Sequence, residues 1–99
     1  MWIYMNDCFL SIIENDEQNL TVCAQRKEDI TRVFPEADVI EMPENDYGCR
    51  TIVTRRDVAM TIAKRILSID YYNFKDSVKE NDRKHIYADI WGNSLQLRK

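Results

Sequence analysis

The chain has 99 residues, a formal net charge of −3, 44% hydrophobic and 31% charged residues, and only two glycines and two prolines. This length and composition are typical of one ordered domain of modest size spanning residues 1–99, and they exclude a disordered or low-complexity chain. No stretch approaches the ~18 apolar residues of a membrane span, and the opening lacks the basic segment and cleavage site of a signal peptide. We therefore expect a cytoplasmic protein without a membrane partner.

The first apolar stretch, residues 1–15, is interrupted by Asn6 and Asp7. Strict alternation through this pair would bury Asp7 unpaired, at a cost of several kcal/mol. We expect one irregular strand with a bulge or break at Asn6-Asp7, beyond which the core-facing side chains change register. Cys8, Leu10 and Ile12 then face the core, while Trp2 and Tyr4 face outward.

The following segments predict a strand, a short helix and a second hairpin. Residues 20–24 alternate like a half-buried strand after a polar hairpin loop at 15–19. Residues 30–34 have helical apolar spacing up to Pro35. Residues 38–43 and 49–55 resemble two strands joined by a long turn, the second being rich in β-branched side chains.

The strongest helical signal begins at Thr54, where a hydroxyl and, three residues later, Asp57 match a capping box. Val58, Ile62, Ile66 and Ile69 follow at helical spacing and predict a wide apolar stripe. A last helix is expected from residue 81 or 82 to Gly92, with residues 95–99 as a short strand or frayed end.

This order of elements predicts an α+β fold. Strands joined by short loops favour antiparallel pairing. We expect a four-stranded antiparallel sheet made of two hairpins, in the order ββαββαα, with two to three helices packed on one face.

Cys8, Cys23 and Cys49 form an odd set with long spacings, which is typical of free thiols in a reducing compartment. One of them could serve as a nucleophile if the fold brought it to His85, the only histidine. A small enzyme or ligand-binding protein with a pocket around His85 is therefore one alternative. The other interpretation is that these cysteines are buried as small hydrophobic side chains.

Charge is unevenly distributed along the chain: residues 1–49 carry 11 acids and 3 bases, and residues 50–99 carry 6 acids and 11 bases. The two halves could form opposite surface patches, or they could interleave and mix. The basic cluster containing Arg50, Arg55 and Arg56 makes nucleic-acid binding a further alternative, although the net negative charge disfavours affinity for phosphates.

Metal and nucleotide motifs are not found in the sequence. Ligand spacings such as Cys-x-x-Cys are missing, and the acidic group Glu41, Glu44 and Asp46 lacks a calcium-loop pattern. The two glycines, Gly48 and Gly92, are too far apart for a phosphate-binding loop. We expect no metal, no cofactor and no catalytic residue.

The remaining signal is a set of tyrosines and tryptophans, the residue types enriched in protein interfaces. A sheet with helices on one face leaves its other face for a partner or a second copy of the chain. We predict a non-enzymatic protein that binds another protein and forms a homodimer. The predicted interaction residues are Trp2, Tyr4, Tyr71 and Tyr72 as anchors, with Glu41, Glu44, Arg55 and Arg56 at the rim.

Five strings, MWIYMNDCFLSIIEN, DITRVFPEADVIEMPENDY, TRRDVA, IDYYNFKDSV and YADIW, together resemble a family of bacterial proteins of about this length that are encoded on chromosomes and mobile elements. The family has no assigned activity, so the resemblance implies no site residue. It implies a prokaryotic cytosolic setting and a mobile-element origin. By analogy of size and setting, it suggests an inhibitor of a host nuclease or defence complex, as anti-CRISPR proteins are.

Overall fold

A computed structural model describes residues 1–98 and divides the chain into two compact units, residues 1–69 and 70–99. The expectation of one domain over residues 1–99 stays a prediction.

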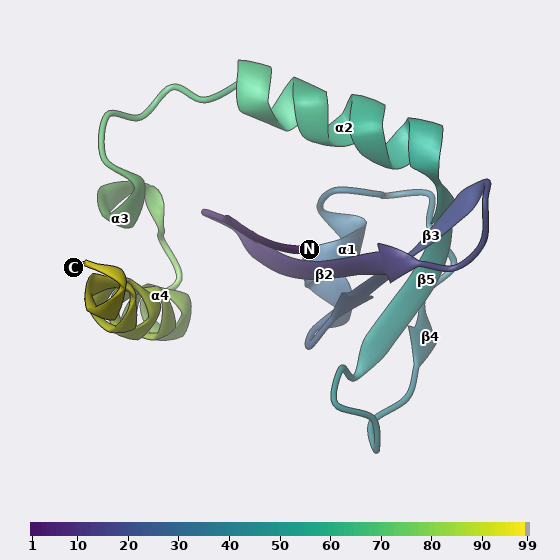
Figure 1. Cartoon of the computed structure of the whole chain (residues 1–99), viewed down its shortest axis with the longest axis horizontal. Coiled ribbons are helices and arrows are strands. Elements are labelled where there is room, and N and C mark those ends of the chain that lie inside the picture. The colour runs from purple at the N-terminus through teal and green to yellow at the C-terminus, as the bar shows by residue number, and fades with distance from the viewer. Residues whose placement is uncertain (99) are drawn as a thin grey trace. The chain divides into compact units, whose positions relative to one another are not determined.

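The first unit is built on a five-stranded antiparallel sheet (Figure 1). Its strands are β1 (Trp2–Met5), β2 (Cys8–Glu14), β3 (Asn19–Ala24), β4 (Ile40–Glu41) and β5 (Cys49–Thr54), in the spatial order β1-β2-β3-β5-β4. The α+β class and the antiparallel sheet are confirmed. The predicted count of four strands and the order ββαββαα are wrong, because the N-terminal stretch forms two strands and not one.

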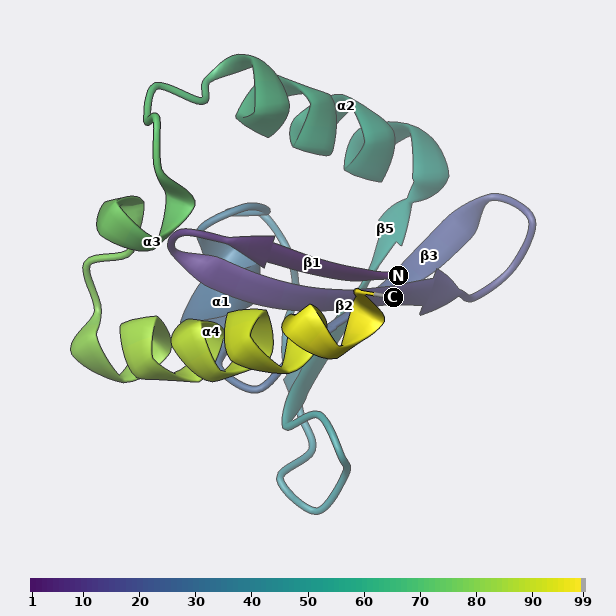
Figure 2. The ribbon, with the colours of Figure 1, turned by 60° about the vertical axis from the view of Figure 1, so that its left-hand side comes forward.

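The extra strand arises at Asn6-Asp7, which form a two-residue turn where a bulge was expected. Met5 pairs with Cys8 and Tyr4 pairs with Phe9, so the chain reverses and β1 lies against β2 (Figure 2). The facing was nonetheless predicted correctly, since paired residues share a face: Leu10 is fully buried and Trp2 is exposed. A reversal leaves the polar pair half-buried at a hairpin tip, which avoids the full burial of an unpaired Asp7 as effectively as a bulge would.

One face of the sheet is covered by α1 (Lys27–Thr31) and α2 (Arg55–Leu67). Every second side chain of the strands points to this face, where it packs with Ile30 of α1, Val58 of α2 and side chains of the α1–β4 connection in one apolar core. Its buried members are Cys8, Leu10, Ile12, Val22, Ala24, Ile30, Val33, Phe34, Cys49 and Val58.

The α2 helix begins as the capping motif predicts, because the Thr54 hydroxyl accepts a hydrogen bond from the Asp57 amide at 3.1 Å. The predicted apolar stripe is covered only in its first half. Val58 is buried and Ile62 packs against the core, whereas Ile66 is 61% and Ile69 is 52% exposed. The core of this unit includes α2 residues only up to Ile62, and Ile69 lies beyond Leu67, where α2 ends.

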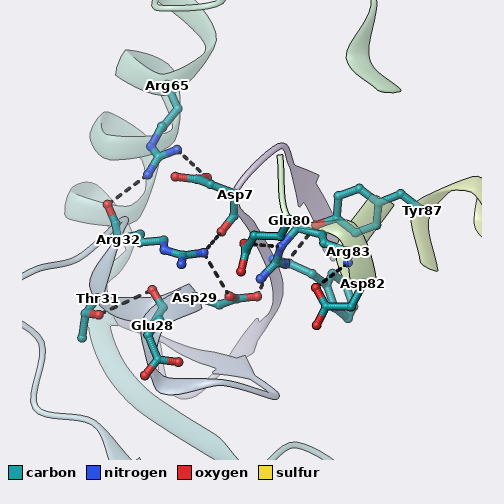
Figure 3. A network of polar contacts seen from close by, with 11 residues as sticks. Asp7, Glu28, Asp29, Thr31, Arg32, Arg65, Glu80, Asp82, Arg83 and Tyr87 are labelled. Atoms are coloured by element: carbon teal, nitrogen blue, oxygen red, sulfur yellow. Dashed lines mark hydrogen bonds and ion pairs between the residues drawn. The ribbon is translucent and has the colours of Figure 1, made fainter. Parts of the chain in front are cut away.

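The β1–β2 turn is tied to both helices of this unit by a polar network (Figure 3). Arg65 of α2 donates from Nη1 to the Asp7 carboxylate at 2.9 Å and from Nη2 to the Arg32 carbonyl, also at 2.9 Å. Arg32, directly after α1, donates to the Asp7 carbonyl at 2.6 Å, and the Asp29 carboxylate accepts from the Phe9 amide at 2.9 Å. No residue among 1–98 has a positive φ, so the turn is not of the type that best matches strand twist. These contacts supply part of its stabilisation.

The second unit contains α3 (Phe74–Ser77), α4 (Asn81–Ser94) and a short 3-10 helix, η1 (Leu95–Leu97). Phe74 stacks on Tyr87 of α4 with ring centroids 5.7 Å apart, and Arg83 Nε binds Glu80 at 2.9 Å (Figure 3). The start of α4 was predicted correctly, but its end at Gly92 was not. Gly92 has a negative φ and lies within the helix, so it does not cap the end. Where a short strand or frayed end was expected, Leu95–Leu97 form a 3-10 helix and Arg98 is extended, and Lys99 lies outside the described residues.

Across residues 1–98, no helix combines the length and the apolar character that a bilayer crossing requires.

Candidate binding surfaces

The sheet of the first unit has a second face, opposite the one that α1 and α2 cover. Side chains alternate across a strand, so the register places Trp2, Tyr4, Phe9 and Ser11 together on this face. The same alternation continues the face through Ile13, Cys23, Arg50 and Ile52. Ile13 is 54% and Ile52 is 59% exposed, so this face has large apolar side chains in contact with solvent.

Four rings gather on this face and are here called the aromatic cluster: Trp2, Tyr4, Phe9 and Tyr47. Tyr4 and Phe9 are cross-strand partners and stack with centroids 4.4 Å apart and planes 5° from parallel. Trp2 meets the Phe9 ring edge to face at 6.1 Å, and Tyr47 approaches it at 6.4 Å. Such pairs contribute about 0.5–1.5 kcal/mol each beyond burial. Phe9 is therefore the centre of a preorganised aromatic surface.

Tyr47 reaches the cluster from the loop between β4 and β5. The loop is held to the end of β3, because Gln25 Nε2 donates to the Asp46 carbonyl at 2.6 Å. Burial raises the pKa of Tyr4, and the neighbouring Tyr47 raises it further. The Tyr4 hydroxyl therefore stays protonated, as a hydrogen-bond donor, throughout the neutral range.

Arg50 lies beside this cluster on β5, directly across from Cys23. Its Nε is buried and has no hydrogen-bond partner, and no ion pair of its side chain is found in residues 1–98. Burial raises the pKa of the Cys23 thiol, and the charge of Arg50 opposes that rise. A buried N–H donor without an acceptor costs free energy, so an acceptor supplied by a ligand would be favoured here.

Two of the predicted anchors, Trp2 and Tyr4, meet in the aromatic cluster. Tyr71 and Tyr72 belong to the second unit, where Tyr71 contacts Phe74 at 6.0 Å and Tyr72 is fully exposed. Phe9 was not among the predicted interaction residues. Alternation from the inward-facing Cys8 and Leu10 was the signal that could have identified it, since it places Phe9 on the outward face with Tyr4.

The predicted rim residues do not form one group. Arg55 binds inside its own unit: its Nη2 meets the Glu14 carboxylate at 2.6 Å and the Asp16 carbonyl at 3.0 Å. Arg56 is exposed on α2, and Glu41 and Glu44 are exposed on β4 and the loop after it. Arg50 and Arg55 lie at opposite ends of β5, so the basic cluster of the sequence does not become one continuous patch.

The three cysteines are all free and buried. Burial raises the pKa of the Cys8 thiol to about 12, aided by the negative charge of Asp7, and burial also raises the pKa of Cys23 and Cys49. A nucleophilic cysteine needs the opposite shift. His85 is exposed on α4 in the second unit. These environments favour the interpretation of the cysteines as small core side chains.

In the part of the chain that the structure describes, no three His, Cys, Asp or Glu side chains are grouped so that they could hold a metal ion. Comparisons with protein-family models, curated proteins and solved structures found no match. The resemblance to a bacterial and mobile-element family therefore stays a prediction.

Proposed function

We propose that this protein acts by binding another protein through the second face of its sheet, and not by catalysis. The observation that carries the proposal is the aromatic cluster: Trp2, 66% exposed, sits on the Phe9 ring beside the stacked Tyr4–Phe9 pair. Tryptophan and tyrosine supply much of the binding energy in protein interfaces. A rigid, preformed surface also loses little conformational entropy when it binds.

The charge of this unit supports a protein partner over a nucleic acid. Residues 1–69 contain 12 acidic and 8 basic residues, a net charge of −4. Phosphate backbones are bound by summed positive charge, which this unit lacks. Exposed Ile13 and Ile52 continue the aromatic cluster on the same face and add apolar area that suits a protein surface.

A narrower form of the proposal is that the bound protein is a host nuclease or a component of a defence complex, which the protein inhibits. Its support is the family resemblance and the analogy of size and setting, not a feature of the cluster. Purified protein added to such a nuclease should reduce cleavage in proportion to binding. Inhibition that persists when binding is lost would contradict this form.

The general proposal is tested by affinity capture with the wild type, Trp2→Ala and Ile13→Ala, followed by titration of the captured protein. The matched control is Leu67→Ala, which removes an 85% exposed side chain from α2. We expect the two sheet-face changes to weaken binding at least tenfold, which corresponds to about 1.4 kcal/mol, and the control to change it less than twofold.

Two results would overturn the proposal. One is equal capture by all variants while circular dichroism shows each of them folded. The other is sedimentation that shows a stable dimer of the wild type and a monomer of Trp2→Ala, because the predicted homodimer would then occupy this face in place of another protein. A parallel Tyr72→Ala variant determines whether the predicted anchors of the second unit contribute.

A further inference from the structure

The edge of β5 that faces β4 is unpaired along the later part of the strand, because β4 is shorter than β5. β4 pairs only with the start of β5, through Ile40 with Arg50 and Glu41 with Cys49 (Figure 1). The Met42 amide donates a hydrogen bond to the Gly48 carbonyl at 2.7 Å, and these two residues continue the register of the β4–β5 pairing. Hydrogen-bonded pairs alternate along an antiparallel ladder, so even-numbered residues of β5 direct their backbone groups toward β4.

The opposite side of β5 confirms this phase. The Arg55 amide donates to the Gln18 carbonyl at 2.9 Å, so odd-numbered residues direct their backbone groups toward β3. Ile52 is even-numbered and lies beyond the last β4 pair. Its N–H and C=O therefore point outward with no strand beside them, and no hydrogen bond from either is found in residues 1–98. The Thr54 N–H has the same orientation.

A groove of about 400 Å³ lies beside this edge. The connection after α1 contributes apolar side chains and Glu36, β5 contributes both apolar and polar residues, and β3 and α2 contribute polar residues. Phe34, Glu36, Ile52, Val53 and Asp57 are among the lining residues. The volume falls within the roughly 300–1,000 Å³ of typical ligand sites.

The charged groups of the groove are all acidic. Glu36 and Asp57 are its only ionisable lining residues, and neither has an ion pair in the described part of the chain. The Asp57 amide donates to the Thr54 hydroxyl, and no hydrogen bond of the Asp57 carboxylate is found in residues 1–98. The groove thus combines an apolar wall, two unpaired carboxylates and an open strand edge.

We propose that this groove binds an extended segment of a partner protein, which adds a strand to β5 at Ile52. Main-chain hydrogen bonds to an open edge supply affinity in this mode, and alternate side chains supply specificity. Side chains flanking the residue paired with Ile52 enter the groove. Charge complementarity requires one of them to be Lys or Arg, against Glu36 and Asp57, and the apolar wall at Phe34 and Val53 favours an aliphatic side chain for the other.

This site is independent of the aromatic cluster and adds a second contact to the same unit. Its ligand is a short sequence of the form aliphatic, any residue, then Lys or Arg, in an extended conformation. The two sites are experimentally separable, because Trp2→Ala should leave binding of such a segment unchanged.

The test uses fluorescein-labelled hexapeptides in which every other residue is threonine, position 2 is valine and position 4 is Lys, Arg, Gln or Glu. Binding of each peptide is measured by fluorescence anisotropy. We expect the Lys and Arg peptides to bind at least tenfold more tightly than the Glu peptide. Glu36→Gln and Asp57→Asn should each reduce that preference by threefold or more. Glu44→Gln, an exposed acid outside the groove, is the matched control and should leave it unchanged.

The strand-addition geometry is tested separately with the variant Ile52→Pro and with a peptide N-methylated at position 3. Proline is tolerated at a strand edge where the N–H faces solvent, so Ile52→Pro removes the outward donor while the bonds to β3 remain. Both changes should abolish binding, and the N-methylated peptide gives this answer with the wild-type protein.

Three outcomes would overturn the inference. Binding that ignores N-methylation would show that no strand is added. Equal binding of the Lys and Glu peptides would show that the carboxylates do not select the ligand. Failure of every peptide to bind at millimolar concentration would show that the groove is not a peptide site.

Discussion

Asp7 and Arg65 are 58 positions apart and meet through a 2.9 Å ion pair between Oδ1 and Nη1. This contact joins the tip of the first hairpin to the long helix that ends the unit. Arg65 also binds the Arg32 carbonyl, so one guanidinium holds the turn and the end of α1. The polar pair that interrupts the first apolar stretch is thus a tertiary anchor as well as a turn.

Asp7→Asn should lower the free energy of unfolding by about 0.5–1 kcal/mol, since both side chains are partly exposed and solvent screens the pair. The expected fall in melting temperature is a few degrees. Asp38→Asn is the control, because Asp38 is exposed and has no ion pair in residues 1–98. Equal melting temperatures for the two variants would show that the ion pair adds no stability.

Acid should remove the difference between the wild type and Asp7→Asn. Burial alone would raise the pKa of Asp7, but the hydrogen bond and charge of Arg65 outweigh it and lower the pKa below its ordinary value. A carboxyl whose pKa is lowered by folding stabilises the folded protein at pH values above its unfolded-state pKa of about 3.9. This contribution is lost as the pH falls through the folded-state pKa. Urea midpoints should therefore differ at neutral pH and converge near pH 2.

The pKa of Asp16 is also lowered, mainly by the Gln18 amide and then by the Asn19 side chain. Because Asp16 is present in both proteins, its contribution cancels in this comparison. A difference in urea midpoint that stays constant from neutral pH to about pH 2 would exclude titration of Asp7 as its source.

Leu10→Ala and Ile13→Ala should differ sharply, although both lie on β2 and remove similar side chains. Leu10 is fully buried in the core, whereas Ile13 is 54% exposed on the second face. We expect a loss of about 3 kcal/mol for Leu10→Ala and less than about 1 kcal/mol for Ile13→Ala. Denaturant unfolding measures both. Similar losses would mean that the second face is covered in solution.

Cys8 should resist alkylation in the folded protein. A thiol pKa of about 12 leaves about one molecule in ten thousand as thiolate at pH 8, and the side chain is fully buried. Mass spectrometry after iodoacetamide treatment should show labelling of Cys8 slowed at least a hundredfold relative to protein in urea. Rapid labelling of Cys8 under native conditions would contradict its place in the core.

The elements that depend on neighbours in sequence could be predicted well. Thr54 and Asp57 predicted the start of α2, and alternation in residues 20–24 predicted β3. The outward orientation of Trp2 and Tyr4 was also predicted correctly. Once Cys8, Leu10 and Ile12 face the core, their alternate neighbours face outward, and Trp2 and Tyr4 pair with two of these neighbours. The unexpected result was the turn at Asn6-Asp7, since a bulge and a reversal bury the same side chains.

The sequence by itself determined the α+β class, the antiparallel pairing and the inward-facing residues of β2, since these follow from local periodicity and turn chemistry. Only the tertiary structure decided which distant groups meet: Tyr47 with Phe9, Arg65 with Asp7, and the groove beside Ile52. These contacts depend on strand order and on where β4 ends. Both are set by packing over long sequence separations, which no local pattern records.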